Sequence, residues 1–218
     1  MSWGRWTPGS GRWRPPRAAA GLGREQARER LLGLAPDDGR PVVLAVGRLV
    51  PQKNFHLLLD AARGWREERD GVPRPLVVLA GDGQEDQELR ARIEAEGLPV
   101  RMLGYREDVP DLLAAADAVV LSSRWEARSL VAQEALRAGV PLVATAVGGV
   151  PELVGDAAVL VPCGDPGALS SAVSALLGDA GRRAALAAAG REQAATWPDE
   201  DATVALVLSV YDELVATA

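Results

Sequence analysis

The chain has 218 residues and a formal net charge of −6, from 24 Lys and Arg against 30 Asp and Glu. This acidic balance argues against a protein that binds nucleic acid through its bulk charge. With 48% hydrophobic residues, the chain can form one well-cored domain or two small ones. No apolar run approaches the roughly 20 residues that span a bilayer.

The N-terminus carries no secretory signal segment, so we expect a cytoplasmic protein. The single cysteine, Cys163, excludes an internal disulfide and fits a reducing compartment. We expect its side chain to be buried, because an unpaired cysteine usually packs as a small apolar residue.

The first 40 residues differ in composition from the remainder. Residues 1–17 contain three Trp, four Arg and no acidic residue, with many Gly and Pro, which predicts an irregular arm. A linker is the simplest reading, and a peripheral contact of its Trp and Arg with an anionic membrane surface is an unsupported alternative. The sequence predicts a short helix over residues 24–34. We divide the chain into this arm and helix (1–40), a central domain (41–195) and a C-terminal helix (196–218).

From Pro41 onward, short β-branched apolar runs alternate with segments of helical periodicity. The predicted strands cover residues 42–47, 76–81, 100–104, 118–123, 141–145 and 157–162. The predicted helices cover residues 53–69, 84–96, 108–115, 130–138 and 166–177, with two more near 181–194 and 200–217. Strands without a polar alternation are buried on both faces, and the intervening helices require parallel crossovers. The pattern predicts an α/β fold with a doubly wound, Rossmann-like parallel sheet.

Ligands of such sheets bind beyond the carboxyl ends of the strands, and the loop GRLVPQK after the first strand carries two cations there. Arg48 and Lys53 lie near the start of a predicted helix, where they would form an anion site with the free N–H groups. Two solvated surface charges are the alternative. The P-loop pattern is absent, and the GDG at residues 81–83 lacks the third glycine of the dinucleotide fingerprint, so a nicotinamide cofactor is poorly supported.

Two glutamates flank the start of the predicted helix 130–138. Ser129 is its expected N-cap and Gly139 its expected stop. Glu126 precedes the cap and Glu134 lies about one turn inside, with the backbone N–H groups of residues 127–130 between them. Carboxylates accept hydrogen bonds from vicinal hydroxyls, so a sugar or ribose beside a phosphate would suit this arrangement. The alternative is two ordinary surface glutamates.

Several motifs occur in an informative order: GRLVPQKN, GDG, LGYRED, SSRWEARSLVAQEALRAGVPLVATAVGGVPELV and PCGD. Together they closely resemble the C-terminal half of GT-B glycosyltransferases, and more narrowly the retaining family 4 (group 1). The resemblance covers about Arg40 to the C-terminus. It implies that residues 41–195 form a Rossmann-like nucleotide-sugar-binding domain, the C-terminal half of a GT-B architecture.

The resemblance also implies roles for individual residues. Arg48 and Lys53 would hold the donor diphosphate and Glu126 would face the donor sugar, which makes these three the catalytic set. Glu134 would take the ribose hydroxyls. The further donor-binding residues would be Gly47, Tyr105, Arg106, Ala127, Arg128, Ser129 and Leu130, with Tyr105 and Arg106 contacting the base through main chain.

Three of these positions depart from the family pattern. Ala127 and Ser129 stand where the family often has glycine, and both are small enough to keep close backbone approach. Arg128 replaces a residue that is commonly aromatic or aliphatic, and it is either a third anion contact or simply exposed.

The implied reaction is transfer of a sugar from a nucleoside diphosphate sugar to an acceptor, with retention and without a metal or cofactor. A nucleotide-sugar-binding module or remnant without turnover is one alternative. A non-catalytic interaction protein that uses the last helix is another. The acidic run 199–201 could suggest metal ligands, but a helix N-cap with an acidic first turn explains it better.

In the family, an N-terminal domain binds the acceptor and the last helix returns to it. Only about 40 residues precede the first strand here, so the expected partner is an acceptor-binding N-terminal domain or a separate chain. The last helix carries a broad apolar face for that contact, formed by Val204, Leu206, Val207, Val210, Tyr211 and Leu214. The donor base and sugar, the acceptor and the oligomeric state stay open.

Overall fold

The computed structural model describes residues 21–35, 38–66, 73–198 and 200–216. Its centre is a six-stranded sheet with the order β3-β2-β1-β4-β5-β6. The strands are β1 (Val42–Val46), β2 (Leu76–Ala80), β3 (Val100–Gly104), β4 (Ala118–Leu121), β5 (Leu142–Thr145) and β6 (Ala158–Val161). Every pairing is parallel. The predicted doubly wound α/β sheet is confirmed, and its order reverses between β1 and β4.

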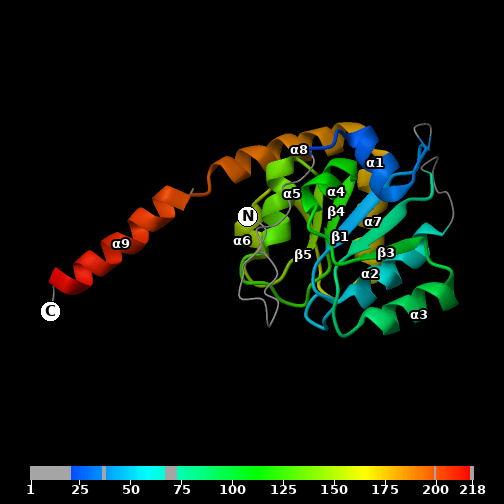
Figure 1. Ribbon diagram of the computed structural model, residues 1–218, viewed down its shortest axis with the longest axis horizontal. Coiled ribbons are helices and arrows are strands. Elements are labelled where there is room, and N and C mark those ends of the chain that lie inside the picture. The colour runs from blue at the N-terminus through cyan, green and yellow to red at the C-terminus, as the bar shows by residue number, and fades with distance from the viewer. Residues whose placement is uncertain (1–20, 36–37, 67–72, 199, 217–218) are drawn as a thin grey trace, which may run out of the picture.

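Helices cover both faces of this sheet (Figure 1). One face packs against α1 (Arg24–Leu32), α4 (Val109–Ala115), α5 (Leu130–Ala138) and α6 (Val150–Val154), and the other against α2 (Phe55–Ala62), α3 (Asp86–Glu96) and α7 (Pro166–Gly178). Alternate residues of each strand serve the two layers: Val42 and Leu44 belong to the first core, Val43 and Ala45 to the second. Because both faces are covered, the central strands carry almost no polar residue.

The structure differs from the sequence prediction at some boundaries. The helix expected from Lys53 begins at Phe55, because Asn54 has φ 51° and ψ 48° and breaks the helical path before it. The five-residue α6 was not predicted, since so short a helix shows no periodicity. Strand β3 is only partly buried because it forms the sheet edge. The predicted arm 1–17, residues 67–69 and Asp199 lie outside the described residues.

Two helices follow the sheet. Helix α8 (Ala180–Ala195) packs along α5, whereas α9 (Glu200–Ala216) projects away from the domain (Figure 1). The apolar side chains that are described on α9 are largely open to solvent, from 49% for Val210 to 77% for Val215, while those of Leu206 and Leu214 lie outside the described residues. Their expected packing against another domain stays a prediction. Within the described ranges, no helix has the length and apolar character needed to cross a membrane.

Candidate functional site

The loops after β1 and β4 are joined to one another at the point where the sheet order reverses. The Arg124 N–H donates to the carbonyl of Gln52 at 2.8 Å, and Ser122 Oγ donates to the carbonyl of Lys53 at 2.9 Å. The side chain of Gln52 returns a hydrogen bond to the carbonyl of Trp125 at 3.0 Å. These contacts fix the two loops beside each other, at the place where α/β sheets bind ligands.

Lys53 and Glu126 meet between these loops. Lys53 Nζ lies 2.5 Å from Glu126 Oε1, and Ser123 Oγ donates to the same oxygen at 2.7 Å. The Glu126 side chain is 7% exposed and that of Lys53 is 16% exposed. Thr145 on β5 holds Ser123 in turn, through a hydrogen bond of 2.7 Å to its carbonyl. A carboxylate this buried needs the partners it has, and its second oxygen, Oε2, makes no hydrogen bond with the residues described.

The loop after β5 packs directly against the backbone of the Glu126 segment through two glycines. A Cβ on Gly148, whose φ is +51°, would lie 2.1 Å from the carbonyl oxygen of Glu126. A Cβ on Gly149 would lie 2.1 Å from the carbonyl oxygen of Ala127, and the Gly149 N–H donates to the Glu126 carbonyl at 2.9 Å. Only glycine allows this approach, so the position of Glu126 depends on the VGG sequence.

A pocket of about 210 Å³ lies at the carboxyl ends of β1, β2 and β3, and it is lined in part by Gly47, Arg48, Tyr105 and Arg106. The structure therefore brings these four predicted residues together. Arg48 is exposed, and its guanidinium forms no hydrogen bond or ion pair with the described residues. Arg106 is paired with Asp108, Nε to Oδ1 at 2.7 Å, and this bond raises the pKa of Arg106. Arg48 is thus available for an anionic ligand, whereas the charge of Arg106 is already balanced.

Gly47 connects this pocket to the Lys53–Glu126 pair. A Cβ on Gly47 would lie 3.6 Å from Lys53 Cδ, so the lysine side chain passes directly over the glycine. Gly81, with φ +152°, brings the loop after β2 even closer to Gly47, since a Cβ on Gly81 would lie 1.8 Å from the carbonyl oxygen of Gly47. The GDG segment thus packs backbone against backbone on the GRL segment. GDG lacks the third glycine of the dinucleotide fingerprint, and in the structure it has this packing role instead.

Helix α5 carries the second glutamate of the pair. Ser129 is its N-cap, as predicted, and its Oγ accepts a hydrogen bond from the Ala132 N–H at 3.3 Å. Glu134 is half-buried and its carboxylate has no hydrogen bond to the residues described, while burial raises its pKa. A carboxylate held in this state is typical of a ligand-binding position. Leu130, at the first turn, is half exposed.

Arg128 has a contact that neither of its two expected roles included. Its guanidinium carbon lies 5.7 Å from the centroid of the Trp197 ring, and that of Arg137 lies 5.2 Å from the same ring. Both distances are within the range of cation–π attraction. Trp197 belongs to the segment between α8 and α9, so this contact links the Glu126 loop to the root of the last helix. No motif or periodicity in the sequence pointed to Trp197.

Two further residues near the site were misread or missed. Cys163 is exposed, so the prediction of a buried thiol is wrong. It lies in the loop after β6, with its Sγ 4.0 Å from the Ser123 carbonyl, rather than in the strand. Ser123 itself was not selected, although a polar residue directly after a buried strand was a usable signal. In the described part of the chain, no group of three or more His, Cys, Asp or Glu side chains could hold a metal ion.

The reversed sheet order, with polar loops at its carboxyl edge, defines a Rossmann-like α/β domain. The family model described as Glycosyl transferases group 1 matches residues 32–193. The chain therefore belongs to this family, and it corresponds to the C-terminal domain of a GT-B glycosyltransferase.

Individual relatives agree with this assignment. The chain is 38% identical over 213 residues to the D-inositol 3-phosphate glycosyltransferase of Salinispora arenicola, covering 91% of this chain and 47% of the relative. It is 34% identical over 167 residues to the 2-deoxystreptamine N-acetyl-D-glucosaminyltransferase of Streptomyces fradiae, covering 74% and 39%. The crystal structure of HepE from Anabaena with UDP-glucose is 28% identical with a TM-score of 0.74, covering 88% and 52%. The chain thus spans about half the length of these relatives or less.

Proposed function

We propose that this chain is the donor-binding half of a glycosyltransferase that moves a sugar from a nucleoside diphosphate sugar to an acceptor. The observation that carries this proposal is the buried Lys53–Glu126 pair at the switch point of the sheet, in a chain that also holds an unpaired, half-buried Glu134. The UDP-glucose bound by HepE supports a uridine nucleotide as the donor.

The diphosphate would be held by Lys53 and Arg48. A lysine ammonium has three N–H donors, so Lys53 can keep its bond to Glu126 and still donate to a phosphate oxygen. The unpaired guanidinium of Arg48 offers a bidentate contact. As the bond to the sugar breaks, negative charge grows on the leaving diphosphate, and these two fixed cations would stabilise it. We therefore propose a reaction that needs neither metal nor cofactor.

The remaining donor contacts follow from the same geometry. Glu126 would face the sugar with its free Oε2, in a transfer that retains the anomeric configuration. Glu134 would accept hydrogen bonds from the two ribose hydroxyls, which supply the donors that its half-buried carboxylate lacks. The base would lie against the main chain of Tyr105 and Arg106, in the pocket they share with Arg48. Residues 127–130 would approach the phosphates through their backbone N–H groups.

The acceptor side would be completed by an N-terminal domain or a partner chain. Three large apolar side chains near the donor residues are exposed: Tyr105 by 43%, Trp125 by 60% and Leu130 by 51%. Exposed apolar groups beside a site mark a surface that another protein part covers. The apolar α9 would add to the same contact. We further propose a cytoplasmic location, which suits an unpaired exposed thiol such as that of Cys163.

Calorimetric titration tests the donor site directly. UDP, GDP and ADP would be titrated into the purified chain in the presence of a metal chelator, and we expect saturable binding of UDP. Glu134→Ala should weaken this binding about tenfold, because the ribose hydroxyls lose their acceptor. Glu152→Ala is the matched control, since Glu152 is an exposed glutamate at the same sheet edge whose side chain forms no hydrogen bond or ion pair with the described residues.

Two results would contradict the proposal. One is the absence of binding for all three nucleotides, and the other is equal affinity in the wild type and in Glu134→Ala. Turnover is tested separately, by the release of UDP from UDP-glucose in the presence of an acceptor-binding partner. Binding without such release would favour the nucleotide-sugar-binding module over the transferase.

A further inference from the structure

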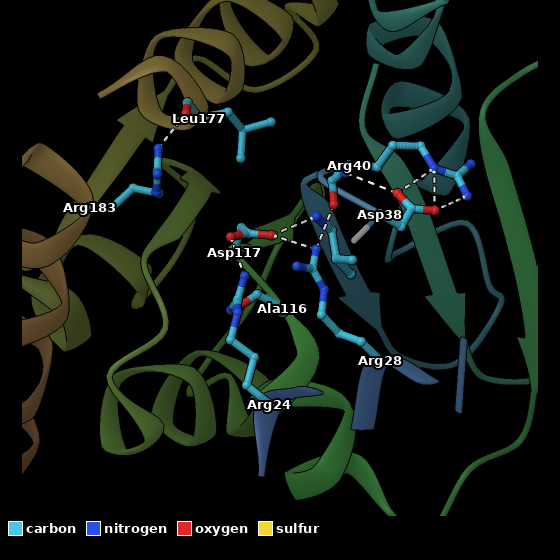
Figure 2. Close-up of polar contacts among 9 residues, drawn as sticks. Arg24, Arg28, Asp38, Arg40, Ala116, Asp117, Leu177 and Arg183 are labelled. Carbon is cyan, nitrogen blue, oxygen red and sulfur yellow. Dashed lines mark hydrogen bonds and ion pairs between the residues drawn. The ribbon is translucent and has the colours of Figure 1, made fainter. Parts of the chain in front are cut away.

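A second charged cluster lies at the amino edge of the sheet, opposite the donor loops. Figure 2 shows Arg24 and Arg28 from α1 reaching Asp117, which directly precedes β4, with the paired Arg40 and Asp38 beside them. A fourth arginine, Arg183 of α8, reaches the carbonyl of Leu177 in the same view. None of these residues has a part in the donor site.

The two carboxylates of this cluster are fully used by their partners. Asp117 Oδ1 accepts from Arg24 at 2.5 Å, while Oδ2 accepts from the Val42 N–H at 2.7 Å and from Arg28 at 3.3 Å. Asp38 accepts from Arg40 through both oxygens, which lowers the pKa of Asp38 to about 2. Four arginines thus face two aspartates, and the cluster holds an excess of two positive charges.

Among the described residues, Arg183 lacks a carboxylate partner, and Arg28 shares Asp117 with Arg24. Arg183 Nη1 donates to the carbonyls of Leu176 and Leu177 at the end of α7, and no carboxylate of the described chain pairs with its guanidinium. Burial lowers the pKa of Arg28, and its Nε is buried without a hydrogen-bond partner. A guanidinium in this state is stabilised by any anion that reaches its open N–H groups.

These arginines surround a cavity. A pocket of about 280 Å³ is lined by Arg28, Arg40, Asp117 and Arg183. A second pocket of about 400 Å³ shares Asp117 and Arg183 with the first. Its other walls are mostly small or apolar residues, among them Leu113, Ala138, Val140 and Ala187. One compartment therefore suits an anionic group, and the adjoining one suits a less polar organic part.

We propose that this amino-edge pocket binds a phosphate monoester, with the phosphate between Arg28 and Arg183 and the organic group in the adjoining pocket. A phosphate monoester carries about −1.5 to −2 charges at neutral pH, which matches the excess charge of the cluster. Guanidinium groups bind phosphate oxygens in bidentate pairs. Arg28 Nη1, Arg183 Nε and Arg183 Nη2 have no hydrogen bond to the described residues, so they are open to such a ligand.

Isothermal titration with glycerol 3-phosphate, against sodium chloride of matched ionic strength, tests this pocket in the full chain. We expect saturable binding that Arg183→Gln weakens about tenfold, while the glutamine keeps a donor for the α7 carbonyls. Arg182→Gln is the matched control, because Arg182 directly precedes Arg183 on α8, is exposed and lines neither pocket. Lys53→Ala should leave this affinity unchanged, since Lys53 belongs to the opposite edge.

The source of the phosphate is distinguished by a second arm. If the ligand is a lipid headgroup, the wild type should sediment with vesicles of phosphatidic acid in phosphatidylcholine, and Arg183→Gln should stay in the supernatant. Failure of both probes would overturn the proposal, as would equal losses in Arg182→Gln and Arg183→Gln. Loss of glycerol 3-phosphate binding in Lys53→Ala would instead assign the anion to the donor site. Should Arg183→Gln not fold, Arg28→Gln serves in its place.

Discussion

The two edges of the sheet place charged groups in different ways. At the carboxyl edge, glycine loops pack backbone against backbone, and Lys53 and Glu126 form a pair with little exposure. At the amino edge, two long arginine side chains of α1 reach Asp117, and Arg24 is 45% exposed. A buried pair is strong only while both partners are present, whereas exposed pairs contribute little individually. The donor edge should therefore be far more sensitive to substitution.

The largest effect is expected from Gly148→Ala. The new Cβ would collide with the carbonyl oxygen of Glu126, at a positive φ that alanine already disfavours. The Glu126 segment would have to move, so we expect a stability loss of about 3 kcal/mol or more and loss of nucleotide binding. Chemical denaturation and calorimetry measure the two effects.

Gly97→Ala provides the control for that substitution. Gly97 has nearly the same φ, +58°, but a Cβ there would meet no atom within 4 Å. It should cost about 1 kcal/mol from the backbone alone, with nucleotide binding intact. Equal effects of the two substitutions would show that the close packing of the loops is unimportant.

Lys53→Met should have the next largest effect. It leaves the Glu126 carboxylate buried beside Ser123 without its cation, which should cost about 3 kcal/mol of stability. Glu126→Gln in the same chain removes the unpaired charge and should recover most of that loss. Denaturation curves of the single and double variants measure this recovery. A double variant no more stable than Lys53→Met would contradict the prediction.

Glu134→Gln should give a smaller effect of opposite sign. Because burial raises the pKa of Glu134, the folded state binds a proton more readily than the unfolded state, and ionised Glu134 costs stability at neutral pH. Removing that charge should raise the melting temperature at neutral pH, and the gain should fade as pH falls below the ordinary carboxyl range. Nucleotide affinity should decrease in the same variant. If Glu134→Gln instead lowered the melting temperature at neutral pH, the claim that the ionised Glu134 carboxylate destabilises the folded state would be wrong.

The smallest effect is expected at the amino edge. Arg24→Gln removes one partly exposed partner of Asp117, which keeps Arg28 and the Val42 N–H. We expect a stability loss of at most about 1 kcal/mol, with unchanged UDP binding. Thermal melts and calorimetry measure both. A loss as large as that of Lys53→Met would remove the contrast between the two edges.

Much of the fold could be read from local sequence. Each central strand is a short β-branched run that sits between helical segments, and local signals such as Ser129 and Gly139 fixed the bounds of α5. The bounds of the edge strand β3 were predicted correctly, but its partial burial and the short α6 were not, because both depend on neighbours that the local pattern does not contain. The exposed Cys163 was misjudged for the same reason.

The sequence by itself determined the parallel sheet, the loops that carry ligand chemistry and the residue types of the donor site, since each depends on local periodicity or on a motif. Only the tertiary structure decided that Lys53 binds Glu126, that Ser123 shares the same oxygen, and that Arg128 and Arg137 both lie over Trp197. It alone gathered four arginines around two aspartates at the far edge. Most of these contacts join residues tens of positions apart, and the distances between such residues are set by the packing of helices and loops on the sheet.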